Sequence, residues 1–298
     1  MTQAAARTDL PVSTTAGESA EKRQARRRRR VRIGVQVALL ILVFLVSVFP
    51  FYWMVTTSLK TQQAALASPP EWIFDPTLKH YADALFRRDV LGSLLNSLIV
   101  AVSTTALAIG IGAPAAYALA RYEFKAKREL FFWFVTNRMI SPIVLALPVF
   151  LMARWLDLMD THLVLILVYL TFNLPVVVWL CTDQFASIPR DLDEAARLDG
   201  ASRFTIFTRI ALPLAAPGIA VSAIFSFIFS WNELLYALIL TRSDARTAPV
   251  AATSYMSGYK LPWGEIMATG SLIAIPVVVF ALVVSRQMVR GLTLGAVK

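Results

Sequence analysis

The densest group of side chains able to do chemistry lies in one polar segment, residues 189–213, between two apolar stretches of the chain. Pro189 suits the first turn of a helix, because its missing N–H would have no intrahelical partner there. Acidic residues follow at 191, 193 and 194, near the positive end of the helix dipole, and Gly200 fits the left-handed position just past the helix end. The spacing predicts a polar helix of about 11 residues, roughly 16 Å long.

This helix carries groups suited to binding a protein rather than to catalysis. Leu192, Ala195 and Ala196 form a small apolar face of low relief, which fits close docking into a groove. Charged side chains flank this face as an adjustable rim: Arg190, Asp193 and Arg197. A helix this short is marginal in water by itself, so it must lie either in a groove of a partner or on its own bundle or membrane surface. Ser202 can cap a second short helix that leads to Pro213.

Motifs for catalysis are absent from the sequence. His80 and His162 are the only histidines, so the chain has no H-E-x-x-H metal site, and G-x-S-x-G does not occur. No lysine follows a glycine, which excludes a phosphate loop of the form G-x-x-x-x-G-K-[ST]. We therefore expect a protein that is not itself an enzyme and binds no metal. If ATP energises it, another subunit must hydrolyse the ATP.

Few polar residues stand at or near membrane depth, where ionisable groups usually face a bundle interior or water. They are Arg138, Asn173, Asn232 and Glu233, the candidate solute-path residues. Arg138 fits either helix packing and snorkelling or contact with a polar or anionic solute. Glu233 fits an interfacial or partner-facing carboxylate as well as a site. No array of acidic residues indicates a proton relay.

Six apolar runs must position these groups. Hydrophobic residues make up 57% of the chain and charged residues only 16%, against roughly 25% charged in soluble domains. Each run is near or above the 20 residues needed to cross a bilayer core. The runs are 33–59, 91–120, 130–152, 162–181, 213–240 and 266–285. The predicted fold is an all-α membrane protein with six transmembrane helices.

Lysine and arginine set the predicted orientation. Residues 22–32 carry eight of them immediately before the first apolar run, as expected for a topology anchor rather than for nucleic-acid binding. With the N-terminus inside, the inside segments hold 20 Lys and Arg and the outside segments 8. We therefore predict cytoplasmic termini, a disordered basic cytoplasmic tail over residues 1–32, and a six-helix membrane domain over 33–298 with residues 182–212 as a cytoplasmic loop.

The segment beginning at Glu194 resembles the EAA motif of ABC importer permeases, E-A-A, three residues, G, nine residues, I-x-L-P. The motif is matched without departure by Glu194, Ala195, Ala196, Gly200, Ile210, Leu212 and Pro213. Other stretches resemble the second permease of maltose-type carbohydrate-uptake systems. They are FPFYWMVTTSLK at 49–60, YALARYEFKAKRE at 117–129, FSWNELLYALILT at 229–241 and VRGLTLGAVK at 289–298. The resemblance covers residues 40–298 and leaves the arginine-rich tail outside.

The resemblance implies a type I importer permease in the bacterial inner membrane, with residues 182–212 holding a coupling helix. Implied partners are a second permease, two cytoplasmic ATP-binding subunits, which bind the ATP and Mg²⁺, and an external or periplasmic solute-binding protein; this chain would contact membrane lipid and bind no cofactor or nucleic acid. Implied solutes are sugars, polyols, and phospho- or sulfo-glycosides. The alternative, an ion-coupled secondary transporter, requires coupling-ion ligands at the midplane, for which the chain offers a poor set.

Overall fold

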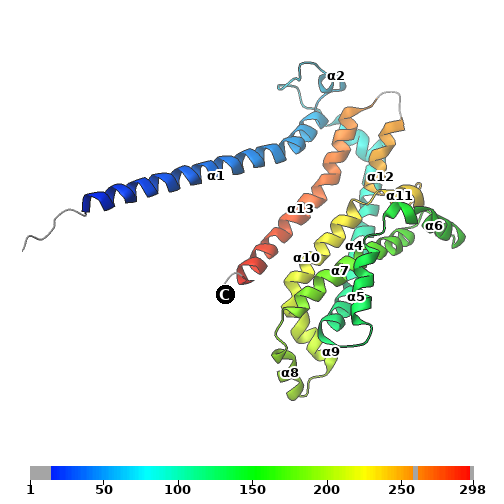
Figure 1. The fold of residues 1–298 in the computed structure, drawn as a ribbon. Helices are drawn as coiled ribbons and strands as arrows, with labels where there is room; N and C mark the ends of the chain where they lie inside the picture. The colour runs from blue at the N-terminus through cyan, green and yellow to red at the C-terminus, as the bar shows by residue number, and fades with distance from the viewer. Residues whose placement is uncertain (1–14, 258–260, 296–298) are drawn as a thin grey trace, which may run out of the picture. The chain divides into compact units, whose positions relative to one another are not determined.

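The computed structural model describes the backbone of residues 15–257 and 261–295, and the side chains of residues 28–255 and 261–280. Every regular element in these residues is helical (Figure 1). The long helices are α1 (Thr15–Ser58), α4 (Val90–Arg121), α7 (His162–Ala186), α10 (Leu212–Trp231) and α13 (Trp263–Gly295). The shorter ones are α2 (Gln62–Ala65), α3 (Lys79–Ala82), α5 (Lys127–Asn137), α6 (Pro142–Trp155), α8 (Asp191–Leu198), α9 (Arg203–Ile206), α11 (Leu235–Leu240) and α12 (Ala248–Thr253). Tighter or wider turns form η1 (Asp83–Arg87), η2 (Phe207–Ala211) and η3 (Ser254–Ser257).

The chain divides into two compact units, Met1–Trp53 and Met54–Lys298. The described residues of the first unit belong to one helix, α1, which begins at Thr15 and ends at Ser58. Residues 15–32 were expected to be disordered but are helical, because Ala, Glu, Gln, Lys and Arg all favour helix and the apolar run continues it. The same expectation for residues 1–14 lies outside the described residues.

Helices α4, α7 and α10 pack against one another at the centre of the second unit and run side by side in Figure 1. Small residues allow this close approach in an apolar bundle. A Cβ atom added to Gly112 of α4 would lie 2.7 Å from Cγ1 of Val177 on α7, too close for any larger side chain to fit without movement. The central helices therefore form the frame from which the connecting segments emerge.

Five helices are long and apolar enough to cross a membrane, and a bent pair brings the number to six in the described residues. The predicted third span, 130–152, is this pair: α5 and α6 meet at an angle of 92°. Ser141 is extended, with φ −65° and ψ 129°, because the ring of Pro142 disfavours the helical conformation in the preceding residue. Pro142 then begins α6, so the break follows from local chemistry that hydropathy does not register.

The predicted fifth span, 213–240, lies too far toward the C-terminus. The continuous apolar helix runs instead over Arg203–Trp231, because the η2 turn joins α9 to α10 without a break. The chain then starts a new helix, α11, whose first N–H groups are capped by Glu233. One carboxylate oxygen accepts the N–H of Tyr236 at 3.0 Å and the other that of Ala237 at 3.1 Å. The other four predicted spans coincide with long apolar helices.

The two ends of the second unit hold the segments that the charge pattern groups together. Residues 121–128 and 182–212 share the end where α8 and α9 lie in Figure 1. Residues 153–161 and 241–245 share the other end, where the Asp160 carboxylate accepts N–H groups from four successive residues of the second segment. The predicted pairing of the connections is thus present.

Candidate functional site

Helix α8 forms where the sequence predicts a polar helix, and its termination is local. Gly200 has φ +81°, the left-handed conformation that glycine adopts without steric cost. The N–H of Gly200 donates to the carbonyl of Arg197 at 3.0 Å, and that of Ala201 to the carbonyl of Ala196 at 2.9 Å. This pair of bonds is the Schellman motif, which satisfies the last carbonyls of the helix. Gly200 therefore fixes the direction in which the chain leaves α8.

The beginning of α8 differs from the prediction. Regular helix spans eight residues, Asp191–Leu198, about 12 Å at 1.5 Å per residue, and Pro189 lies before it rather than in its first turn. Arg190 occupies the N-cap position and makes no side-chain capping bond. Three acidic residues in the first turn and Arg197 in the last match the helix dipole instead.

The apolar docking face is also assigned differently. Ala196 is buried, whereas Leu192 and Ala195 are exposed. Asp193, expected on the charged rim, is the other buried residue of α8. The helix thus turns Asp193 and Ala196 toward its own bundle and leaves the rest of its surface free in this chain.

Asp193 is buried because it meets Arg121, the last residue of α4. Arg121 Nε lies 3.0 Å from Asp193 Oδ2, and the two side chains are 3% and 5% exposed. The same guanidinium donates from Nη1 to the carbonyl of Ile188 at 2.9 Å. Sequence reasoning counted Arg121 only as a topological charge, because nothing local indicates a partner so far along the chain.

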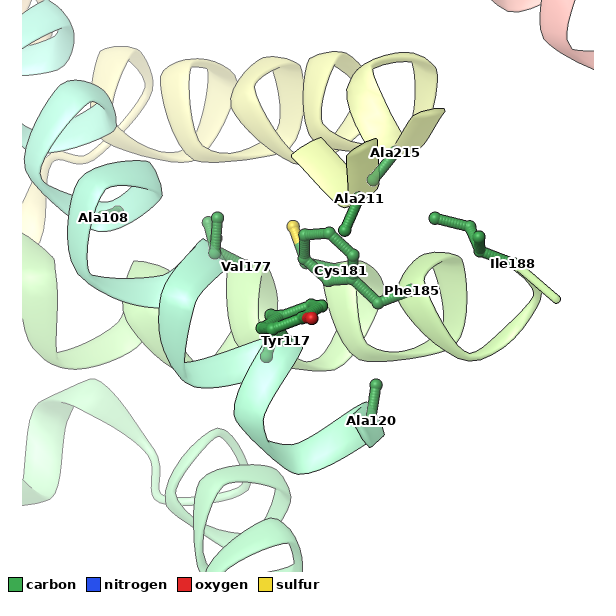
Figure 2. Close-up of a cluster of buried hydrophobic side chains, with 11 residues drawn as sticks. Ala108, Tyr117, Ala120, Val177, Cys181, Phe185, Ile188, Ala211 and Ala215 are labelled. Carbon is green, nitrogen blue, oxygen red and sulfur yellow. The ribbon is translucent and has the colours of Figure 1, made fainter. Parts of the chain in front are cut away.

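Next to this ion pair, an apolar cluster joins the ends of α4, α7 and α10 that lie nearest to α8. Tyr117 packs edge-on against Phe185, with ring centroids 5.4 Å apart, and lies 5.0 Å from the ring of Phe207 in η2. Figure 2 shows Tyr117, Phe185 and Ile188 lining the space between these helices. The connection that carries α8 is therefore anchored in the bundle at both of its ends, at Ile188 before the helix and at η2 after it.

The second half of the motif continues into the bundle. Ser202 caps α9, as the sequence predicts, by accepting the N–H of Thr205 at 3.2 Å. Ile210 lies in η2 and is partly buried. Pro213 is exposed near the start of α10, within one continuous apolar helix rather than at the beginning of a span. These residues direct the chain from α8 back into the membrane helices.

Among the four candidate solute-path residues, Arg138 lines a pocket of about 320 Å³. It follows the last residue of α5, at the break before α6. Its guanidinium carbon lies 4.7 Å from the ring centre of Phe229 and 6.0 Å from that of Phe172. The remaining walls of the pocket are apolar and aromatic, with Trp179 and Phe225 among them. Within the described residues Arg138 forms no ion pair with a carboxylate.

The structure does not bring the other three residues to that pocket. Asn173 is fully buried between α7 and α10, where its Nδ2 donates to the carbonyl of Tyr169 at 2.9 Å and to Ser230 Oγ at 3.0 Å. Asn232 is the C-cap that follows the last residue of α10, and its Nδ2 donates to the carbonyl of Ile228 at 2.9 Å. Glu233 caps α11 as described above.

At the opposite end of the bundle, Asp160 was missed by sequence reasoning. Burial raises the pKa of its carboxyl, but the backbone N–H groups of residues 242–245 outweigh this effect and hold the pKa well below its usual range. Asn96 of α4 connects the same two segments to α4. Its Nδ2 donates to the Asp244 carbonyl at 2.9 Å, and its Oδ1 lies 2.8 Å from His162 Nε2. Such capping by one carboxylate leaves no signal in single-residue patterns.

A family model described as a binding-protein-dependent transport system inner membrane component matches residues 108–293. The chain belongs to this family. The trehalose transport permease SugB of Mycobacterium tuberculosis is 40% identical over an alignment of 268 residues that covers 83% of this chain and 97% of SugB. The trehalose/maltose permease MalG of Thermococcus litoralis is 35% identical over 85% of this chain and 92% of MalG. The predicted resemblance to maltose-type permeases is confirmed.

Solved structures confirm the fold. A chain of a bacterial ABC transporter that imports the acidic polysaccharide alginate aligns with a TM-score of 0.70, at 22% identity, over 87% of this chain and 97% of that one. The predicted all-α ABC importer permease fold is therefore correct. Family membership favours an ABC transporter permease over the ion-coupled alternative.

Proposed function

We propose that this chain is the transmembrane permease of an ATP-driven importer for a sugar or a sugar-like solute, and that α8 is its coupling helix. The observation that carries the proposal is the arrangement of α8. It is a short polar helix that stands at one end of the bundle with six of its eight residues exposed. A helix of this length needs a partner to be stable, and its exposed Leu192, Glu194 and Leu198 offer apolar and charge-assisted contacts.

The proposed partners follow from this arrangement and from the family. A cleft on each of two cytoplasmic ATP-binding subunits would receive α8 or its counterpart on a second permease, and those subunits would bind ATP and Mg²⁺. An external solute-binding protein would deliver the solute. The family description supports an inner-membrane location and a binding-protein-dependent system. The excess of Lys and Arg in segments near α8 supports a cytoplasmic position for this end and for both termini.

The solute class is supported by the relatives, whose printed names include trehalose, trehalose/maltose, diacetylchitobiose and sulfoquinovosyl glycerol transport. Arg138 is the residue proposed to meet the solute. A cation that forms no ion pair with a carboxylate of the described residues, at a break between two membrane helices, is costly unless it faces water or a polar ligand. Aromatic walls next to it suit a sugar ring, and its charge suits an anionic group on that ring.

One experiment tests the central claim. The full chain, tagged and purified from its native host, should carry an ATPase and a second permease, and proteoliposomes of that complex with the binding protein should accumulate labelled disaccharide in an ATP-dependent manner. Glu194→Lys should weaken ATPase attachment or uncouple hydrolysis from uptake, while the chain still inserts at normal levels. Full attachment of the ATPase subunits and normal coupling of hydrolysis to uptake in this variant would refute the proposal that α8 is the coupling helix.

A further inference from the structure

Helix α8 touches its own bundle through very few groups. Asp193 and Ala196 are its two buried residues. Ala196 offers one methyl group, whereas Asp193 forms a buried ion pair with Arg121 of α4. The partner of Asp193 is therefore decisive for whether a displacement of α8 moves the bundle or is absorbed by bending of the connection.

That partner, Arg121, is placed to make a stiff link. It ends α4, and its planar guanidinium lies against Asp193 through Nε and donates to the Ile188 carbonyl through Nη1, in a fixed geometry that a lysine ammonium lacks. Arg121 lies at the negative end of the α4 dipole and Asp193 at the positive end of the α8 dipole, so both helices favour the charges they carry.

Burial separates this ion pair from others nearby. The Lys127–Glu123 pair, with Nζ and Oε1 2.9 Å apart, has side chains 30% and 74% exposed. Water screens such a pair and leaves its geometry loose. Arg121 and Asp193 are shielded from water, where charges interact more strongly and a misplaced partner is more costly.

We propose that Arg121 and Asp193 are positioning residues that fix α8 to the inner end of α4, so that the two helices move as one body when the coupling helix is displaced. The inference rests on the proposed role of α8, and it names the contact through which that role acts. The pair touches neither solute nor nucleotide.

Distance measurement tests the link directly in the assembled transporter. Spin labels on cysteines at Ile111 of α4 and at Asp191, the first residue of α8 and outside the motif, both exposed, should give a narrow distance distribution in the otherwise cysteine-free protein. Asp193→Asn should broaden it, because the buried arginine loses its counter-charge. Glu123→Gln is the matched control, because it removes exposed ion pairs only, to Lys127 at 2.9 Å and to Arg190 at 4.0 Å, and it should leave the distribution unchanged.

Function is measured on the same proteoliposomes as solute taken up per ATP hydrolysed. Asp193→Asn should lower this ratio about tenfold, within the range of typical couplings between sites, while the ATPase subunits stay attached through the exposed face of α8. Exchange of the two charges, Arg121→Asp with Asp193→Arg, should recover part of the ratio and narrow the distribution again. Should Asp193→Asn fail to accumulate, Arg121→Lys keeps the charge, loses the bond to Ile188 and serves in its place.

The failures of the two proposals are distinguishable. An unchanged distance distribution in Asp193→Asn would overturn the positioning role, whatever α8 binds. A broadened distribution with an unchanged uptake-to-hydrolysis ratio would overturn it as well. Normal coupling in Glu194→Lys, by contrast, would overturn α8 as the coupling helix and leave the distance result untouched.

Discussion

Gly200 offers a sharp test of the proposed coupling loop, because its effect on the backbone can be separated from side-chain contacts. The residue has φ +81°, and a Cβ atom added there would meet no heavy atom within 4 Å. A substitution at this position therefore costs backbone strain and not a steric clash. An ordinary L-residue in the left-handed conformation pays about 1–2 kcal/mol, asparagine less, and a β-branched residue up to about 3 kcal/mol.

These free-energy costs lower the population of the native backbone conformation at Gly200, in which the chain leaves α8 toward α9. A penalty of 1–2 kcal/mol changes the ratio of native to alternative conformations by roughly 5–30-fold. Any relaxed conformation with negative φ would break the bonds that Gly200 and Ala201 make to the last turn and would redirect α9. Uptake per ATP should therefore fall in the order glycine, asparagine, alanine, valine.

The assay is uptake and hydrolysis in parallel proteoliposomes, with the membrane level of the chain measured by immunoblot. The level should stay near normal, because Gly200 is exposed and lies outside the apolar helices. The series Gly200→Asn, Gly200→Ala and Gly200→Val separates backbone conformation from side-chain size. Equal effects of asparagine and valine, or no effect of either, would refute the argument from backbone strain.

Three further predictions address other parts of the molecule. Ile73→Cys and Leu198→Cys, 96% and 90% exposed in a cysteine-free background, should label from opposite sides of the membrane with an impermeant thiol reagent; labelling from the same side would contradict the topology. Arg138→Gln should lower uptake of an anionic solute about tenfold or more, the worth of a charged hydrogen bond, and Arg138→Lys should lower it less; equal uptake in all three would assign Arg138 to packing. Asp160→Asn should lower the melting temperature, because an amide cannot accept four N–H groups as a carboxylate does, whereas exposed Asp157→Asn should not. Since the pKa of Asp160 is lowered from 3.8, its contribution should persist from pH 8 to pH 5 and be lost only as pH falls below that value; a loss near neutral pH would contradict the assignment.

The features that sequence reasoning placed correctly are those set by neighbouring residues. Helix α8, the left-handed Gly200 and the Ser202 cap each depend on a few consecutive side chains, so their signals are local. The face that α8 buries depends on Arg121, which belongs to another helix. The spacing of apolar residues alone therefore predicted, wrongly, that Asp193 lies on the exposed rim. Tertiary contacts of this kind carry no periodic signal.

The differences between prediction and structure at the third and fifth spans have a related cause. Hydropathy is continuous through residues 130–152 and 213–240, so a window sees one helix where the chain makes two. The break at Pro142 had a visible signal in the proline itself. The break after Trp231 had a weaker one, Glu233, which was interpreted as a solute or interfacial carboxylate although it caps α11.

The motif residues divide into two groups once the structure is considered. Glu194 and Ala195 face outward, where a partner can reach them, and Gly200 sets the direction of the exit. Asp193, one residue before the motif, faces inward and joins α8 to α4. The proposed coupling role requires both kinds of contact. A partner that displaces α8 through its exposed face moves the membrane helices only if the Arg121–Asp193 contact stays intact. The inner contact should therefore be as sensitive to substitution as the motif itself, although it lies outside the pattern by which the family is recognised.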